Sequence, residues 1–374
     1  MQTTDTGLLF QSSQQLADAS TRERKIVAAE KVGNPIKVTS KVLDLVVRGQ
    51  DAWTAESGWQ ARRLDLNILY KGHKGPVTSV RLHQVGGQRP WLALITSSWD
   101  KTIRIWDADS GQLVHTLEAH SDFVKSTTVL PTVPPMLLST SSDKSFRLWD
   151  LSPLTEKGIP VSRQVVKEHT RPVDSAAYAL CEEEPSIMLV WTADSMGVLK
   201  EWKISHLPTG TYPLTFVRDL PGHETSIAGL ARTDDGLWST RLHGTTPVIL
   251  QHPSYVKSIL PNPNGLPYIV TGSEDEDIRV WDAATLDGDH NQPVAIVSGH
   301  CGEVSALVTW IKDAGGKKEV IIVSAGLDAT LRRWSIDDLL NPVPLNYEPV
   351  KPNSGATMTE EEERELAELM SDED

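Results

Sequence analysis

The chain has 374 residues and a mass of 41.2 kDa, which is long enough for one large closed domain or for two or three smaller ones. Its 50 acidic and 36 basic residues give a formal net charge of -14, so a general nucleic-acid-binding surface, which needs clustered cations, is not expected. The two cysteines, Cys181 and Cys301, lie far apart without a CxxC or histidine-rich context. The sequence therefore predicts neither a zinc site nor a disulfide framework, and it favours a reducing compartment.

Residues 1–24 are expected to form an N-terminal extension. The first twenty residues contain Asp5 and Asp18 and no Lys or Arg, a composition that fits neither a secretory signal nor an Arg-rich transit peptide. No run of apolar residues approaches the roughly eighteen needed to cross a bilayer. These features predict a soluble protein of the cytoplasm or nucleus with no membrane association.

A repeated pattern occupies the middle of the chain. Short β-branched runs alternate with Gly, Asp and Ser turns, and there are twelve Trp against four Phe. Four segments place an Asp six residues before a Trp: SWDKTIRIWD from Ser98, SSDKSFRLWD from Ser141, SEDEDIRVWD from Ser273 and GLDATLRRWS (Ser in place of the final Asp) from Gly326. A histidine in a turn and an apolar strand precede each segment. The pattern predicts one four-stranded unit that is repeated.

These four copies resemble the repeats of the WD-repeat β-propeller family, and the resemblance covers about residues 40–336. It implies that a loop His, a strand Ser or Thr, the turn Asp and the strand Trp form a hydrogen-bonded network in each blade. Such buried polar groups need mutual partners, and each net bond contributes about 1 kcal/mol. The implied networks are His73, Thr96, Asp100 and Trp106; His120, Ser139, Asp143 and Trp149; His252, Thr271, Asp275 and Trp281; and His300, Ser324, Asp328 and Trp334.

Three weaker units bring the expected number of blades to seven. One begins at His169 but has Met196 at the Asp position, with Asp194 two residues early, so its network is expected to be broken or rearranged. The other two, residues 222–250 and 41–67, keep mainly the rhythm of strands and turns. The expected fold is therefore all-β: a seven-bladed WD-repeat β-propeller with a short N-terminal extension and an acidic C-terminal tail.

Closure of the ring sets the expected domain boundaries. The last unit supplies three candidate strands before Pro342, so residues 25–32 are the expected outer closing strand and residues 25–340 the expected propeller. Only 32 residues separate Ile249 from Trp281. This spacing predicts either a fifth blade without its outer strand, which leaves an edge open to a partner strand, or a compact blade with tight turns.

No catalytic constellation is evident. The sequence contains no GxSxG, GxxxxGK[ST], HExxH or GxGxxG motif, and the repeat itself accounts for most histidines and for the turn aspartates. We expect no catalytic residue, no cofactor and no metal.

The positions at which WD-repeat proteins differ point to a partner-binding rim. In the family, partner-binding side chains come from residues flanking the first Val of each inner strand and from the residue before the turn Asp. Here these positions and their neighbours supply Trp99, Phe123, Lys125, Arg171, Tyr255 and Lys257. Aromatic and cationic residues of this kind form binding hot spots. The alternative is that they fill local surface or pack against loops.

Residues 341–374 are expected to form a second module. Four prolines between residues 341 and 355 predict an irregular tether. The segment 359–374 then holds nine acids against Arg364, and Leu366, Leu369 and Met370 would lie on one stripe of a short helix. The tail could fold on a basic partner or fold back onto Lys125 and Lys257, or it could be a solvated tail that aids solubility.

The favoured function is a non-catalytic scaffold, a WD-repeat subunit or adaptor that binds other proteins within a multiprotein complex. The alternative is an acidic-tailed chaperone or escort of a basic protein such as a histone or ribosomal protein. A propeller enzyme is the least favoured. Proteins are the expected partners, with no direct contact to nucleic acid or membrane.

Overall fold

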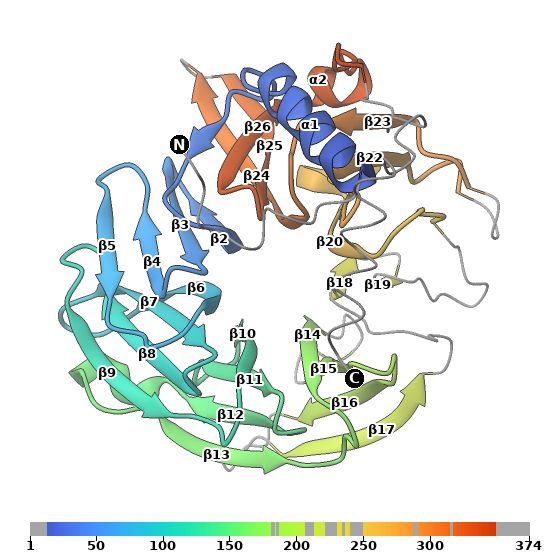
Figure 1. The fold of residues 1–374 in the computed structure, drawn as a ribbon. Helices are drawn as coiled ribbons and strands as arrows, with labels where there is room; N and C mark the ends of the chain where they lie inside the picture. The colour runs from blue at the N-terminus through green and yellow to red at the C-terminus, as the bar shows by residue number, and fades with distance from the viewer. Residues whose placement is uncertain are drawn as a thin grey trace, which may run out of the picture. The chain divides into compact units, whose positions relative to one another are not determined.

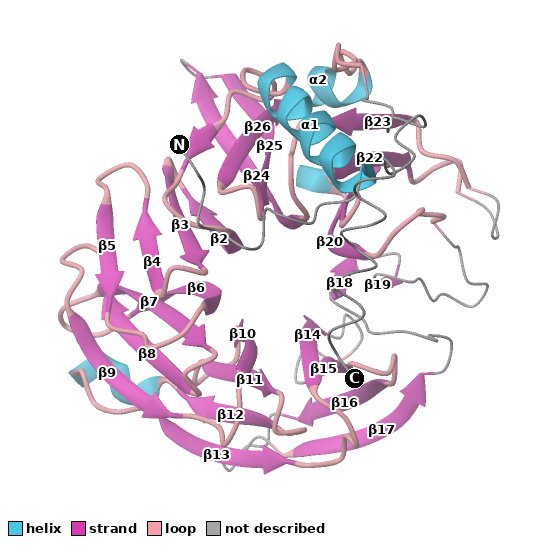
Figure 2. Cartoon of the chain, in the orientation of Figure 1, coloured by secondary structure: helices cyan, strands magenta, loops and turns pink. Residues whose placement is uncertain are grey.

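The structure is a computed structural model that describes residues 13–180, 184, 187–205, 213–220, 230–233, 236–239, 250–286, 291–314 and 317–348. The chain divides into two compact units, residues 1–32 with 344–374 and residues 33–343. Strands make up most of the described chain (Figure 2). The tail residues Leu366, Leu369 and Met370 lie outside the described residues, so the expectations for them stay predictions.

The first unit contains helix α1 (Ser13–Ala28). Its run of Gln, Ala, Glu, Arg and Lys residues favours a helix. The hydrogen bond from Ala29 N to Lys25 O, at 2.9 Å, continues the helical turn. The expectation that residues 25–32 form the closing strand is therefore wrong.

The second unit contains six four-stranded antiparallel sheets, which we call blades and name by their first and last strands (Figure 1). Blade β2–β5 comprises β2 (Val42–Arg48), β3 (Asp51–Glu56), β4 (Gln60–Arg63) and β5 (Ile68–Lys71). Blade β6–β9 comprises β6 (Val77–Val85), β7 (Trp91–Ser98), β8 (Thr102–Asp107) and β9 (Leu113–Glu118). Blade β10–β13 comprises β10 (Val124–Leu130), β11 (Met136–Ser141), β12 (Phe146–Asp150) and β13 (Val161–Val166), with the short 3-10 helix η2 (Ser152–Glu156) before its last strand.

The other three blades follow the same antiparallel order. Blade β14–β17 comprises β14 (Val173–Leu180), β15 (Ile187–Asp194), β16 (Leu199–Ser205) and β17 (Leu214–Leu220). Blade β20–β23 comprises β20 (Val256–Pro261), the 3-10 segment η3 (Pro263–Gly265), β21 (Tyr268–Ser273), β22 (Asp277–Asp282) and β23 (Ala295–Ser298). Blade β24–β1 comprises β24 (Val304–Ala314), β25 (Lys317–Gly326), β26 (Thr330–Ser335) and β1 (Ile36–Lys37), and helix α2 (Ile336–Leu340) follows β26.

The expectation of seven four-stranded blades is also wrong, because the described residues form six. Between blades β14–β17 and β20–β23 they form only a two-stranded pair, β18 (Leu230–Thr233) with β19 (Gly236–Ser239). The sequence here has His243 and Ile249 where the four regular repeats have the turn Asp and the strand Trp. The edge predicted for this unit involves residues 240–249, which lie outside the described residues.

The innermost strands bring the blades together. Strand β2 contacts β6 and β24, β10 contacts β6 and β14, and β18 contacts β14 and β20, which in turn contacts β24 (Figure 1). The two-residue strand β1 completes the last blade, because Ile36 pairs with Leu331 of β26. Apolar side chains of adjacent blades form the core, as where Val77 and Val80 of β6 pack with Trp53 of β3. A chain segment preceding the first blade thus completes the last one.

Candidate partner-binding face

Three of the four implied networks are complete. In blade β6–β9, His73 Nδ1 lies 2.8 Å from Asp100 Oδ2 and His73 Nε2 lies 2.8 Å from Thr96 Oγ1, to which Trp106 Nε1 donates at 2.9 Å. These distances fit one neutral histidine whose Nδ1–H donates to the carboxylate while its Nε2 accepts from the hydroxyl. The same contacts join His120, Asp143, Ser139 and Trp149, and also His300, Asp328, Ser324 and Trp334.

A fourth complete network lies where the sequence predicted a broken or rearranged one, and it is rearranged. In blade β14–β17, His169 Nδ1 lies 3.1 Å from Asp194 Oδ2 and Trp202 Nε1 donates to Thr192 Oγ1 at 2.8 Å. Asp194 is the last residue of β15, at the position that Ser98 has in blade β6–β9, and its carboxylate accepts from the backbone N–H groups of Met196 and Val198 at 3.0 Å each. The aspartate thus comes from the strand end instead of from the turn.

The network of blade β20–β23 is open, although its motif is regular. Thr271 Oγ1 lies 3.1 Å from His252 Nε2 and accepts from Trp281 Nε1 at 2.9 Å. His252 Nδ1, however, is buried without a hydrogen-bond partner, because Asp275 faces Arg279, whose Nη1 donates to Asp275 Oδ1 at 3.1 Å. The structure thus separates His252 from the aspartate that the repeat assigned to it.

The pKa values of these groups follow their contacts. Burial alone raises the pKa of Asp100, but hydrogen bonds from His73 and from the Lys74 N–H outweigh it, so the pKa of this carboxyl lies well below its ordinary value. Burial lowers the pKa of His73, and burial together with the charge of Arg279 lowers that of His252 to about 4. His73 and His252 are therefore neutral near pH 7 and Asp100 is ionised, so these groups make structural polar contacts within their blades.

A repeated backbone contact shows which residues share one face of the blades. In six blades, the N–H of the residue at the turn after the second strand donates to the carbonyl of the residue just before the first strand. The donor and acceptor pairs are Ser57 and Lys41, Trp99 and Pro76, Ser142 and Phe123, Ser195 and Pro172, Glu274 and Tyr255, and Leu327 and Glu303. Because the contact recurs at the same place in every blade, these turns and strand starts lie on one face, which we call the turn face.

A β-bulge follows the first Val of each innermost strand. The pairing register shifts at the second residue of β2, β6, β10, β14, β20 and β24. The shifted residues include Lys125, Asp174 and Lys257. Because a bulge bends a strand and redirects a side chain, the fold sets these positions apart from the regular in-and-out alternation.

Trp99 and Phe123 form an exposed aromatic pair on the turn face. Their rings stack with centroids 5.2 Å apart and an interplanar angle of 19°. Trp99 is 43% exposed and Phe123 is 40% exposed, although aromatic residues normally bury most of their surface. The pair joins blades β6–β9 and β10–β13 and forms a continuous apolar surface on that face.

The other predicted rim residues are more dispersed. Tyr255 is 58% exposed, but it precedes β20, whose neighbours are β18 and β24, so it does not extend the Trp99–Phe123 pair. Lys125 Nζ lies 3.7 Å from Asp174 Oδ1, and Lys257 Nζ lies 3.6 Å from Glu303 Oε2. These lysines therefore bridge neighbouring blades, while Arg171 is exposed just before β14.

The sequence missed one further aromatic residue on the turn face. Trp59 lies two residues after Ser57, as Lys101 does after Trp99, and both have left-handed φ angles, 65° and 73°. Trp59 is 55% exposed. Its unit lacks the Asp and Trp of the motif, so only the shared backbone contact could reveal its equivalence.

The described residues contain no group of three or more His, Cys, Asp or Glu side chains arranged to hold a metal ion. Within the same residues, no helix has the length and apolar character needed to cross a membrane.

Comparison with known proteins agrees with the blade geometry. The family model of the WD domain, G-beta repeat, matches residues 65–107, 111–150 and 244–282. The chain contains WD repeats. The matched segments end at Asp107, Asp150 and Asp282, each directly after the tryptophan that its blade places in a polar network.

Proteins similar to this chain carry names that give different roles. An uncharacterized WD repeat-containing protein of Schizosaccharomyces pombe is 26% identical over the full length of both chains. The ribosome biogenesis protein WDR12 homolog of Oryza sativa subsp. japonica is 24% identical over 70% of this chain and 66% of its own. The COMPASS component SWD3 of Saccharomyces cerevisiae is 25% identical over 68% of this chain and 73% of its own.

Proposed function

We propose that this WD-repeat protein is a non-catalytic scaffold or adaptor that binds a partner protein of a multiprotein complex through its turn face. The carrying observation is the stacked, exposed pair of Trp99 and Phe123. Exposed aromatic residues on a rigid support are the usual centres of protein-protein interfaces. The family gives a consistent setting, since one relative is named as a component of COMPASS and another as a ribosome biogenesis protein.

The structure around the pair supports a preformed site. Backbone bonds of 3.0 Å from Trp99 N to Pro76 O and 2.9 Å from Ser142 N to Phe123 O fix the loops that carry the rings. The Lys125–Asp174 bridge joins β10, the strand that follows Phe123, to its neighbour β14. A partner would therefore meet aromatic surface whose loops are already ordered, which lowers the entropy cost of binding.

Affinity capture from a native extract of the source organism tests this proposal. We expect a discrete set of proteins to co-purify with the wild type and to be lost with the combined Trp99→Ala and Phe123→Ala variant. Phe216→Ala is the matched control, because Phe216 is 49% exposed but lies on the outer strand β17. Unchanged capture by the folded double variant, with its melting temperature within about 2 °C of the wild type, would exclude the aromatic pair as the interface.

A further inference from the structure

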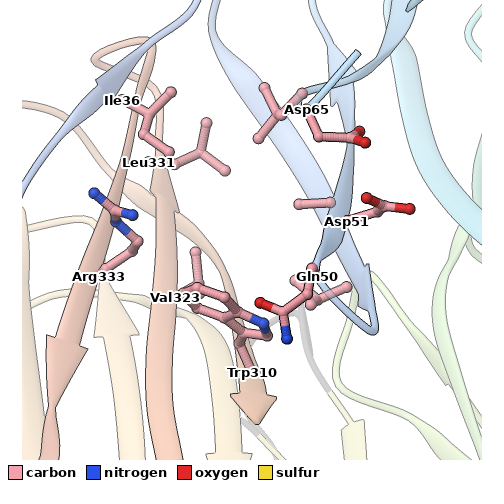
Figure 3. Close-up of a pocket in the computed structure, with 11 residues that line it drawn as sticks. Ile36, Gln50, Asp51, Asp65, Trp310, Val323, Leu331 and Arg333 are labelled. Carbon is pink, nitrogen blue, oxygen red and sulfur yellow. The ribbon is translucent and has the colours of Figure 1, made fainter. Parts of the chain in front are cut away.

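A second surface feature, away from the Trp99–Phe123 pair, is an apolar slot between the first and last blades (Figure 3). It has a volume of about 220 Å³. Its apolar walls are formed by Ile36, Val47, Leu64, Trp310, Val323 and Leu331. Sites for drug-sized ligands usually have about 300–1,000 Å³, so this slot suits a single large side chain.

The walls of the slot are held in place by contacts across the two blades. Trp310 Nε1 donates to Gly49 O at 2.9 Å, which fixes the indole against the β2–β3 turn. Ile36 and Leu331 are paired residues of β1 and β26. The slot is therefore built at the point where strand β1 completes the last blade, and its shape does not depend on a ligand.

One end of the slot has an excess of negative charge. Arg63 Nη2 lies 2.6 Å from Asp51 Oδ2, Arg63 Nε lies 3.0 Å from Asp65 Oδ1, and Arg63 Nη1 lies 3.0 Å from Asp109 Oδ1. One guanidinium thus serves three carboxylates. Burial and the neighbouring Asp65 raise the pKa of Asp51, as expected where carboxylates outnumber cations. A further cation beside Asp51 and Asp65 would relieve this repulsion.

The opposite end of the slot carries Arg333. This residue extends from β26 on the side away from Asp51 and Asp65 (Figure 3). Its Nε is buried and not accessible from the slot. The charge that a ligand in the slot would meet at the other end is therefore that of the carboxylates.

We propose that this slot binds a segment of a partner protein in which a large apolar residue is followed by Arg or Lys. The apolar side chain fills the slot and the basic side chain pairs with Asp51 and Asp65. Charge complementarity selects this ligand, because an acidic residue in place of the basic one would face the carboxylates of Asp51 and Asp65. The site is independent of the turn face.

Fluorine NMR of the full chain labelled with 5-fluorotryptophan tests the proposal, with the Trp310 resonance assigned by its loss in Trp310→Phe. The probe is a blocked tetrapeptide of serine, leucine, arginine and serine. Two matched peptides serve as comparisons. In one, glutamate replaces the arginine, and in the other, serine replaces the leucine. We expect a saturable shift of the Trp310 resonance with the first peptide, at least fivefold weaker binding with glutamate and no saturation without leucine.

Variants locate the binding and separate it from the turn face. We expect Asp65→Asn to weaken binding of the arginine peptide at least threefold and Ala52→Leu, which fills the slot, to abolish it. Asp122→Asn is the control acid beside Phe123, and it and the Trp99→Ala and Phe123→Ala double variant should bind as the wild type does. If Ala52→Leu disturbs the other tryptophan resonances, Asp65→Asn alone decides. Equal binding of the arginine and glutamate peptides, or no shift at Trp310, would overturn the proposal.

Discussion

Blades β6–β9 and β20–β23 carry the same motif at the same spacing, yet their histidines lie in different environments. His73 has a partner on both ring nitrogens, whereas His252 has one on Nε2 and none on Nδ1. Both blades keep the bond from tryptophan to threonine, at 2.9 Å in each. The difference is therefore confined to the position of the aspartate.

Two residues outside the motif explain where that aspartate points. In blade β6–β9 the Lys74 N–H donates to Asp100 Oδ2 at 2.9 Å and the Thr102 hydroxyl donates to Asp100 Oδ1 at 2.7 Å. In blade β20–β23 the corresponding residues are Pro253, which has no N–H, and Asp277, which has no hydroxyl. Without these donors Asp275 pairs with Arg279. The comparison shows that the turn donors orient the aspartate toward the histidine.

The largest effect expected from this comparison is on stability. His73→Ala removes both hydrogen bonds of a buried imidazole and leaves Asp100 without its histidine donor. We therefore expect it to lower the free energy of unfolding by about 2–4 kcal/mol. His252→Ala removes one bond and a nitrogen that is already unsatisfied, so we expect a loss of about 1 kcal/mol. Urea unfolding measures both. Equal losses would show that the open network is closed in solution.

The same comparison shows what the sequence could predict and what it could not. The period of the motif placed Trp106, Trp149, Trp281 and Trp334 on their strands, because a repeat fixes both spacing and environment. It did not assign Asp194 to the network, because this aspartate lies at the end of β15, two positions before the aspartate of the motif, in a turn of the same length. The prediction that Asp275 contacts His252 is wrong for the opposite reason. The spacing of Asp275 is regular, but the N–H and hydroxyl donors that would orient its carboxylate are missing.

The residues of the closing strand and the contacts of the candidate site were beyond sequence reasoning for a different reason. A segment before the first blade does complete the last one, but strand β1 has only two residues and follows Pro35, so it carries no alternating pattern, and residues 25–28 of the expected strand belong to helix α1. The rim positions could be taken from the family. The stacking of Trp99 on Phe123 and the Lys125–Asp174 bridge join separate blades, and such contacts appear only in three dimensions.

A variant designed to close the network of blade β20–β23, which we call the repair variant, should have an effect of intermediate size. The double variant Pro253→Ser and Asp277→Thr supplies blade β20–β23 with the N–H and the hydroxyl that Lys74 and Thr102 supply in blade β6–β9. We expect Asp275 to turn to His252 and the free energy of unfolding to rise by about 1–2 kcal/mol. The converse change, Thr102→Asp, should destabilise blade β6–β9 by a similar amount. A repair variant less stable than the wild type would mean that the Asp275–Arg279 pair is worth more than the closed network.

The smallest expected effect is a difference in pH dependence. His252 has a folded pKa of about 4, below the ordinary value of 6.5, because burial and Arg279 disfavour its charged form. Between these values the unfolded chain binds a proton that the folded chain does not, so this contribution to stability is present above pH 6.5 and is lost as pH falls toward 4. In His252→Gln the free energy of unfolding should fall less steeply between pH 7 and pH 5, by about 1–2 kcal/mol over that range.

The repair variant provides the control for this pH effect. If Asp275 turns to His252, its charge raises the pKa of the imidazole, so the pH dependence of the repair variant should lie between those of the wild type and His252→Gln. Parallel pH profiles for all three proteins would show that His252 does not titrate differently in the folded and unfolded chains. A profile for the repair variant as steep as that of the wild type would mean that the new donors do not bring Asp275 to the histidine, and that Arg279 alone decides where the aspartate points.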